Sequence, residues 1–318
     1  MSNTLEKISL TAVVAAEQAG KRLDQALASV FPEHSRSRLK EWIERGEVRV
    51  NGAVKRPRDK IAENDIIEIE ATLEAVLDWA GEPIPLNIVF EDEHILVINK
   101  PAGLVVHPGA GNKAGTLVNA LLHHLPHLSQ IARAGVVHRL DKETSGLMVV
   151  AKTLASQTQL VSQLQARTVK RRYEAVVCGR LTSGGTVDAP IGRHPFERTR
   201  MAVVESGKTA ITHYRVLERF PAHTHLKLEL ETGRTHQIRV HMAHIHHPIV
   251  GDKTYGGRFR LPPNTHPLVQ NYLRTFPRQA LHAQGLSLVH PVTGEEMGWE
   301  APLPTDIHEL LSALKRGS

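Results

Sequence analysis

Residues 135–152 constrain the fold more than any other stretch of this 318-residue chain. Two apolar runs, 136–137 and 147–151, are rich in β-branched residues, which predicts two strands. The loop between them carries Arg139, Asp141 and Lys142, so the carboxylate of Asp141 has a basic residue on either side of it. A loop that buried strands anchor at both ends holds its side chains in place and leaves them open to a ligand. Asp141 is therefore a candidate reactive group; the alternative is a polar turn whose aspartate bonds only its own backbone.

The bulk composition narrows the class of protein. The chain has 39 Lys and Arg against 33 Asp and Glu, a net charge of +6, which mildly favours an acidic partner such as nucleic acid. Its single cysteine, Cys178, excludes an internal disulfide and lies in an apolar run, so we expect a buried structural thiol. We find no signal-peptide pattern and no apolar run of about 20 residues, and expect a cytoplasmic protein.

The N-terminal region, residues 18–75, predicts a small α/β domain. Apolar residues at three- and four-residue spacing indicate a helix from Gly20 to Pro32 and a second helix that Ser35 caps. Alternation over 8–14 predicts a short edge strand, and Asn51 with Gly52 predicts a hairpin turn. Residues 21–60 carry eleven bases and six acids. At the start of the second helix, backbone N–H groups and cations can converge on phosphate, against the alternative of a solvated face; the cations there are Arg36, Arg38 and Lys40.

After a glycine- and proline-containing linker at 76–87, a second domain is expected over 88–310. Apolar runs predict strands near 95–98, 173–178, 212–217 and 226–230. Helices are expected over 117–122, after a Thr153 cap, and from about residue 235. Because the strands outnumber the helices and do not alternate with them, the pattern favours an α+β fold with a mostly antiparallel mixed sheet over a doubly wound sheet.

Three ordered motifs carry a family resemblance. They are His-Arg-Leu-Asp-Lys-Glu-Thr-Ser-Gly at 138–146, Lys-Arg-Arg-Tyr-Glu-Ala-Val-Val at 170–177 and Gly-Arg-Thr-His-Gln-Ile-Arg-Val-His at 233–241. Together they resemble the RluA-type pseudouridine synthases over 88–310, and residues 18–75 resemble an S4 RNA-binding domain. The resemblance implies the pseudouridine synthase fold and an isomerase that acts on uridines of ribosomal RNA. This reaction needs no metal and no cofactor, so we expect none.

The resemblance also implies residue roles. Asp141 matches the catalytic aspartate, and Arg239 would pair with it to keep it ionised and in position. Tyr173 would stack on the extracted base, and Arg139 would fill the gap that the flipped uridine leaves. Residues in and near the second motif are candidate phosphate contacts; they are Lys170, Arg171, Arg172, Arg193, Arg198 and Arg200.

Two other kinds of site are weakly supported. The glycines at 109–115 lack the spacing of a dinucleotide fingerprint. The histidines at 241–247 could share a helical face, but no acidic residue or cysteine completes a metal-binding pattern.

Within this family, the resemblance implies as substrate the helix 69 stem-loop of 23S rRNA, free or in a large-subunit precursor. We expect a monomer. Two alternatives stay open: an RluC-like synthase of other 23S rRNA uridines, and a non-catalytic S4-type assembly factor.

Overall fold

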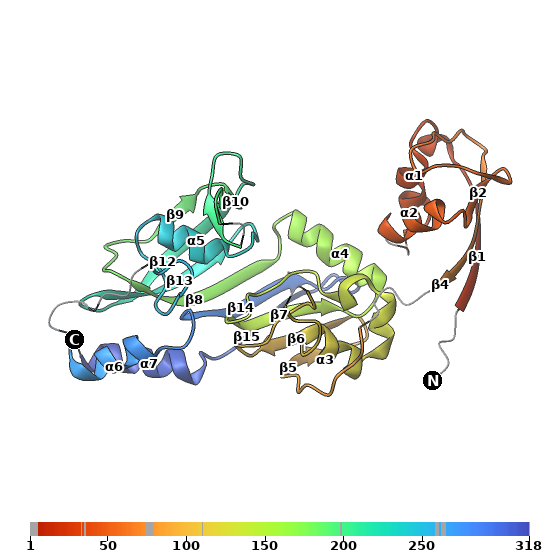
Figure 1. Cartoon of the computed structure of the whole chain (residues 1–318). Helices are drawn as coiled ribbons and strands as arrows, with labels where there is room; N and C mark the ends of the chain where they lie inside the picture. Colours follow the sequence, from red (N-terminus) through yellow and green to blue (C-terminus); the bar gives the residue numbers. More distant parts are fainter. Residues whose placement is uncertain are drawn as a thin grey trace.

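The computed structural model describes residues 6–32, 34, 36–73, 79–109, 111–197, 199–257, 261 and 265–317. These residues form a small N-terminal unit and a larger unit, each with its own buried apolar cluster (Figure 1). The described apolar residues of the small unit's cluster lie between Ile8 and Ala71, and those of the larger unit's main cluster begin at Trp79.

The small unit packs two helices on one antiparallel sheet. The helices are α1 (Leu23–Val30) and α2 (Arg36–Glu44), which follow a short 3-10 helix η1 (Ala16–Gln18). The strands run in the order β1 (Glu6–Val13), β4 (Ile66–Leu73), β2 (Val48–Val50) and β3 (Ala53–Val54). The predicted edge strand and the hairpin at Asn51 and Gly52 are confirmed. Ser35, the predicted cap, lies outside the described residues.

Segment 79–87 runs along the larger unit. The Asn119 side-chain amide donates to Ala80 O at 2.8 Å, and Glu82 N donates to Asn119 O at 2.9 Å. Trp79 packs against the apolar cluster of this unit. The described part of the predicted linker is therefore bound to α3 (Leu117–His124) through hydrogen bonds and packing.

The larger unit is built on a sheet that has nine strands among the described residues. The order is β5-β6-β7-β14-β8-β13-β12-β9, with β15 paired to β14. All neighbours are antiparallel except β7 and β14, which confirms the mixed, mostly antiparallel α+β fold. The bounds are β5 Ile88–Glu91, β6 Ile95–Lys100, β7 Ser145–Ala151, β8 Lys170–Cys178, β9 Gly185–Asp188, β12 Ile211–Arg219, β13 His223–Leu230, β14 Leu281–Val289 and β15 Glu296–Glu300.

Helices and a hairpin complete this unit. They are 3-10 helices η2 (Pro126–Gln130) and η3 (Ala132–Gly135), helices α4 (Leu154–Gln165), α5 (Gln237–His244), α6 (Pro267–Thr275) and α7 (Thr305–Arg316), and the hairpin β10 (Ile191–Arg193) with β11 (Met201–Val203). Thr153 caps α4 as predicted, because its hydroxyl accepts a hydrogen bond from Ser156 N at 3.1 Å. In the part of the chain that the structure describes, no helix combines the length and apolarity that membrane crossing needs.

Strand β7 is buried along its whole length, and it is apolar from Leu147 to Ala151 because both of its faces are covered. Met148 and Val150 join the cluster that holds Tyr173, and Leu147 and Val149 join a second cluster on the other face, with Leu160 of α4. A strand buried on both sides reads as a continuous apolar run. Burial thus explains why this strand was recognisable in the sequence.

The predicted strand at 136–137 is wrong. Residues 132–135 form η3, and Val136 makes a single bridge to Val150. Arg133, Ala134 and Gly135 all have positive φ, 56°, 51° and 75°, so the chain turns sharply just before Val136, which is itself extended but pairs only through that one bridge. At Gly135 a Cβ would lie 1.9 Å from Ala151 O, so the turn needs glycine to lie this close to β7. The turn delivers the loop that carries Asp141.

Replacing Gly135 tests this close approach. We expect Gly135→Ala to lower the free energy of unfolding by about 3 kcal/mol, because a left-handed backbone costs about 1–2 kcal/mol and the overlap with Ala151 O costs about as much again. Gly294, which has φ of 74° and where a Cβ would meet nothing within 4 Å, is the matched control. Gly294→Ala should cost only about 1–2 kcal/mol in the same denaturant titration. Equal losses at both positions would contradict the account.

Candidate active site

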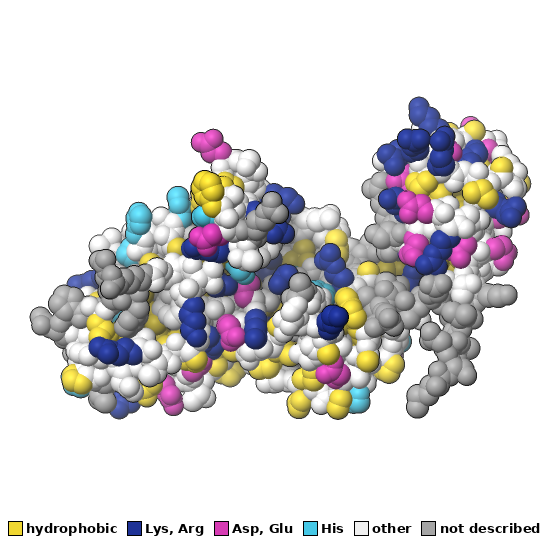
Figure 2. Space-filling model, viewed as in Figure 1, with side chains coloured by type: hydrophobic (Ala, Val, Ile, Leu, Met, Phe, Trp, Pro, Cys, Tyr) yellow, Lys and Arg dark blue, Asp and Glu magenta, His cyan; other side chains and the backbone are white. Residues whose placement is uncertain are grey.

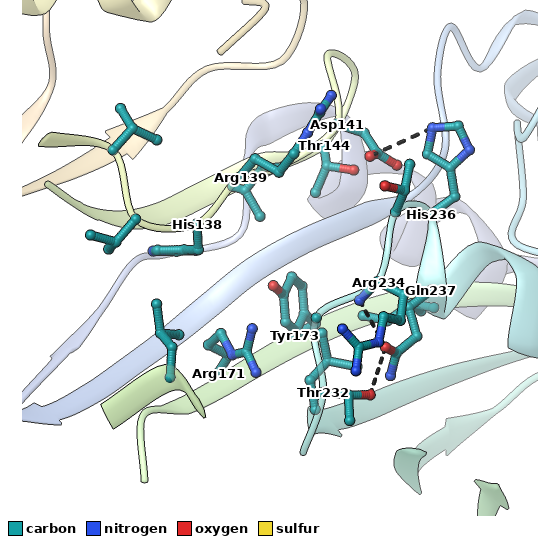
Figure 3. Close-up of a pocket in the computed structure, with 18 of the residues that line it drawn as sticks. His138, Arg139, Asp141, Thr144, Arg171, Tyr173, Thr232, Arg234, His236 and Gln237 are labelled. Carbon is teal, nitrogen blue, oxygen red and sulfur yellow. Dashed lines mark hydrogen bonds and ion pairs between the residues drawn. The ribbon is translucent and has the colours of Figure 1, made fainter. Parts of the chain in front are cut away.

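The three motifs meet in one cavity of about 820 Å³ (Figure 3). Its lining comes from the loop before β7, from β8, and from the segment that joins β13 to α5. Asp141, Tyr173 and Arg239, which lie far apart in the sequence, all line it. The structure therefore brings together the three residues that the motifs predict as catalytic.

Arg239 joins Asp141 to a second carboxylate. Its Nη1 donates to Asp141 Oδ2 at 2.9 Å, and its Nε and Nη2 donate to the two oxygens of Asp252 at 2.7 and 2.9 Å. The side chain of Asp252 is fully buried, whereas that of Asp141 is 16% exposed to solvent. Arg239 therefore holds Asp141 in a fixed orientation at the cavity wall and leaves it accessible.

The charges of this cluster depend on one another. Burial alone would raise the pKa of the Asp252 carboxyl, but the hydrogen bonds and charge of Arg239, with N–H groups of Tyr255 and Thr254, hold it below its usual range. Burial alone would lower the pKa of Arg239, and the two carboxylates raise it instead. Arg239 is thus a permanent cation, as a fixed counter-ion requires.

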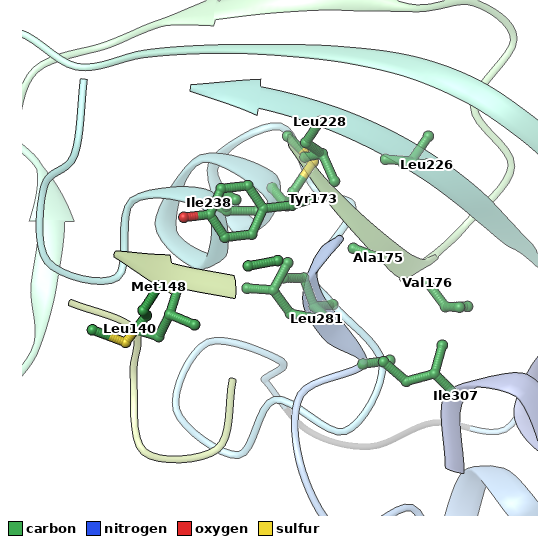
Figure 4. Close-up of a cluster of buried hydrophobic side chains, with 14 of the residues drawn as sticks. Leu140, Met148, Tyr173, Ala175, Val176, Leu226, Leu228, Ile238, Leu281 and Ile307 are labelled. Carbon is green, nitrogen blue, oxygen red and sulfur yellow. The ribbon is translucent and has the colours of Figure 1, made fainter. Parts of the chain in front are cut away.

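Tyr173 forms part of the cavity wall. It lies on β8 opposite Leu228, is 6% exposed, and packs with Met148, Ile238 and Leu281 (Figure 4). Burial raises the pKa of its phenol, so the hydroxyl keeps its proton. A fixed aromatic ring in the wall of a cavity offers a flat surface for a planar ligand.

The Asp141 loop is anchored from behind by two buried basic side chains, Lys100 and Arg278. The Nζ of Lys100, 1% exposed, donates to Pro101 O, Leu104 O and Lys142 O at 2.7, 3.0 and 3.1 Å. Burial lowers the pKa of this amine to about 7. Arg278 donates from its Nη1 to Glu143 O at 3.1 Å. These bonds fix the backbone on the C-terminal side of Asp141.

His138, the residue directly before Arg139, has a structural role. His138 Nε2 accepts a hydrogen bond from Val149 N at 3.1 Å, which ties the loop to β7. Burial, and then the charge of Arg171, lower the pKa of His138 to about 3, so it is neutral as this bond requires. Arg139 itself is exposed at the cavity wall, where a guanidinium can reach an incoming ligand.

The predicted RNA contacts of the second motif separate onto two faces of β8. Arg171 lines the cavity and is 8% exposed, and its buried Nε has no hydrogen-bond partner. Gly233 permits this position, because a Cβ there would lie 2.5 Å from Arg171 Nη1. Arg172 does not line the cavity; it pairs with Glu300 at 2.9 Å. Lys170 is exposed on the same strand and also lies outside the cavity lining.

Arg38 and Lys40, the predicted contacts of the N-terminal unit whose side chains the structure describes, do not line this cavity. Lys and Arg side chains gather on one face of that unit (Figure 2). Lys40 forms an exposed pair with Glu44 at 3.4 Å, and Arg38 donates to Gln130 O at 3.3 Å. The side chain of Arg36 and the whole of Arg198 lie outside the described residues.

Cys178 and His241 lie in surroundings that fit a structural role and not a reactive one. Burial raises the pKa of the half-buried Cys178 thiol to about 11, as in an inert thiol. His241 is buried between the Thr212 hydroxyl and Ala189 O, both at 2.9 Å. Within the described ranges, no group of three or more His, Cys, Asp or Glu residues is arranged to hold a metal ion.

Sequence reasoning missed Asp252, Lys100 and Tyr255, and gave His236 no role although it lies in the third motif. Asp252 and Tyr255 belong to a turn after Val250, and Lys100 ends β6. Each acts through a partner distant in sequence, so no local pattern of residue types marks it. The one signal for His236 was its place in the third motif, three residues before Arg239, where it directly precedes α5.

Comparisons with known proteins agree with the motifs. Residues 94–244 match the family model described as RNA pseudouridylate synthase, and residues 21–67 match the S4 domain. The chain is 60% identical over 311 residues to the ribosomal large subunit pseudouridine synthase D of Pseudomonas aeruginosa PAO1, which covers 98% of this chain and 97% of that protein. The chain belongs to the RNA pseudouridylate synthase family. It is therefore an isomerase, and both predicted resemblances are confirmed.

Other relatives of the synthase extend this result. The ribosomal large subunit pseudouridine synthase D of Escherichia coli K12 is 56% identical over 311 residues, 98% of this chain and 95% of that protein. Two human structures, RNA Pseudouridylate Synthase Domain Containing 4 and Domain Containing 1, superimpose with TM-scores of 0.58 and 0.54 at 29% and 27% identity. They cover 72% and 74% of the synthase, and 93% and 96% of their own chains.

The Arg239–Asp252 pair gives a pH-dependent prediction for the synthase. Asp252→Asn should lower the free energy of unfolding by about 3 kcal/mol at pH 7, because it leaves the buried Arg239 with one carboxylate fewer. The pKa of Asp252 is lower in the folded protein than in the unfolded chain, where it is about 3.9. The ionised carboxylate therefore stabilises the fold fully above about pH 3.9, and this stabilisation is lost as the pH falls through the folded pKa. The gap between wild type and variant should therefore shrink below about pH 4. Denaturant titrations at pH 7, 5 and 3.5 measure it; a gap that widens in acid would contradict the assignment.

Proposed function

We propose that this chain converts uridine to pseudouridine in large-subunit ribosomal RNA, with Asp141 as the catalytic carboxylate. The observation that carries the proposal is Asp141 itself, oriented by Arg239 in a cavity whose wall includes Tyr173. The names of the bacterial relatives, ribosomal large subunit pseudouridine synthase D, support ribosomal RNA as the substrate.

The reaction needs a carboxylate beside the sugar. The bond between uracil N1 and ribose C1′ breaks, the ring turns, a C5–C1′ bond forms, and the hydrogen on C5 leaves as a proton while N1 gains one. Of the described residues that line the cavity, Asp141 and Glu231 carry carboxylates. Both oxygens of Glu231 are hydrogen-bonded, to Arg167 at 3.0 Å and to His213 at 2.7 Å, whereas Oδ1 of Asp141 has His236 no nearer than 3.7 Å and is free to react. Asp141 therefore supplies the nucleophile or base, and Tyr173 stacks on the extracted uracil.

Arg171 offers a site for the RNA backbone. A cation that is 92% buried and lines the cavity without a hydrogen-bond partner for its Nε carries an uncompensated desolvation cost. A phosphate of the target nucleotide provides the missing anion, and a guanidinium binds it through paired hydrogen bonds. Arg139, exposed at the cavity wall, takes the space that the flipped uridine leaves in the RNA stack.

The substrate proposal is the helix 69 stem-loop of 23S rRNA, free or in a large-subunit precursor, bound by a monomer in the cytoplasm. Residues 18–75 serve as the RNA-binding domain, 76–87 as the connection and 88–310 as the catalytic domain. Arg36, Arg38 and Lys40 contribute phosphate contacts in the first of these. An RluC-like choice of other uridines is the second candidate. The complete carboxylate, arginine and tyrosine arrangement speaks against a non-catalytic assembly factor.

Asp141→Asn tests the catalytic assignment. The substitution keeps the shape of the side chain and removes its charge, so we expect no pseudouridine from 23S rRNA while RNA binding stays within about tenfold, or about 1.4 kcal/mol. Mass spectrometry of nucleosides measures the product, and filter binding measures the affinity. Near-normal turnover in this variant would overturn the assignment.

Arg171 and Arg172 make a matched pair, because they are adjacent in β8 and only Arg171 lines the cavity. Arg171→Met should raise the Kd for RNA about tenfold and reduce the slope of log K against log salt by about one. Arg172→Met removes the same charge and only an exposed pair with Glu300, so its affinity should stay within about twofold. Equal losses in the two variants would show that Arg171 contributes only to the overall charge.

A further inference from the structure

His236 and Tyr255 form a contact beside Asp141 to which the proposed chemistry assigns no task. His236 Nε2 lies 3.7 Å from Asp141 Oδ1, and its Nδ1 lies 2.8 Å from the hydroxyl of Tyr255. Arg239 Nη1 binds the other oxygen of the same carboxylate, Oδ2, at 2.9 Å. The two oxygens of Asp141 thus face two different partners, as Figure 3 shows for His236.

The hydrogen bonds decide which nitrogen of His236 carries the proton. The Tyr255 hydroxyl accepts a hydrogen bond from Met201 N at 3.0 Å, and its own proton is then available to His236 Nδ1. A neutral imidazole that accepts at Nδ1 carries its hydrogen on Nε2, which faces Asp141. The opposite tautomer would put a nitrogen lone pair against a carboxylate oxygen.

The ring of Tyr255 is itself held in place by two cations. The guanidinium of Arg239 lies 5.0 Å from the ring centroid and that of Arg200 lies 5.5 Å from it, both within the range of cation–π attraction. The ring therefore stays in position when only the hydroxyl is removed.

We propose that Tyr255 and His236 form a positioning relay for the reaction. The Tyr255 hydroxyl selects the His236 tautomer, and the Nε2–H of that tautomer fixes the plane of the Asp141 carboxylate, which leaves its remaining lone pairs directed into the cavity. A separation of 3.7 Å is longer than a hydrogen bond, and the contact closes when the uridine enters, as catalytic hydrogen bonds commonly do. The relay rests on the proposed role of Asp141.

The backbone conformation at position 236 allows a test that distinguishes the relay from a purely structural role of His236. His236 has φ of 57° and ψ of 21°, the left-handed region in which asparagine is among the best-tolerated residues. The amide nitrogen of asparagine reaches about as far as Nδ1 of histidine, and that of glutamine reaches about as far as Nε2. A backbone role favours His236→Asn, whereas the relay favours His236→Gln.

The assay uses 23S rRNA from cells that lack the protein, labelled with tritium at uridine C5, so that any isomerised uridine releases tritium. His236→Ala and His236→Asn should lower the single-turnover rate by about tenfold with RNA binding within about twofold, and His236→Gln should recover most of that loss. Tyr255→Phe should cost about tenfold alone and nothing further in the His236→Gln background, because the glutamine amide needs no tautomer selection.

His246 provides the matched control. It has φ of 64°, is exposed, and lies outside the cavity lining. The same three substitutions there should leave the rate within about twofold, which shows what the left-handed backbone alone contributes.

The outcomes separate the relay from the role of Asp141. A faster enzyme with asparagine than with glutamine at 236, or a full additional loss from Tyr255→Phe in the glutamine background, overturns the relay. Asp141→Asn is measured in the same assay. Activity in that variant overturns the proposed function, whereas an inactive Asp141→Asn enzyme with equal rates for all His236 variants overturns the relay alone.

Discussion

The bridge from Asp141 through Arg239 to Asp252 is the interaction on which the rest of the site depends. Burying charged groups costs several kcal/mol for each ion unless they are paired and hydrogen-bonded. Asp252 occupies one edge of the guanidinium with two hydrogen bonds, which leaves Nη1 directed at Asp141. A lysine at 239 could not bind both carboxylates in this geometry, because an ammonium lacks the planar fork.

The fold supplies this bridge with fixed attachment points. Arg239 sits on the first turn of α5, and Asp141 follows a turn that Gly135 holds against β7. Lys100 then binds three backbone carbonyls behind the loop. Because each attachment belongs to a buried strand or helix, the carboxylate keeps its position while its open side faces the cavity. The site thus combines a rigid wall with an accessible reactive group.

Much of this arrangement could be predicted from residue patterns. Apolar spacing located α1, α2 and α4, and the two-sided burial of β6 and β7 made them continuous apolar runs. The motifs located Asp141, Tyr173 and Arg239. Asp252 and Lys100 could not be found, because their partners are distant in sequence. The strand predicted at 136–137 is reduced to one bridge from Val136 to Val150, because it stands between the left-handed turn at 133–135 and the loop that carries Asp141. Grouping Arg171 with Arg172 ignored the alternation of side chains along a strand, which sends neighbours to opposite faces.

The measurement that tests the central claim most directly is a map of pseudouridines in 23S rRNA from cells without this protein, and from the same cells supplied with wild type or with Asp141→Asn at equal protein levels. The account predicts that a defined set of uridines loses the modification when the protein is absent, that wild type restores every one of them, and that the asparagine variant restores none. A map unchanged by loss of the protein, or fully restored by the variant, would contradict it.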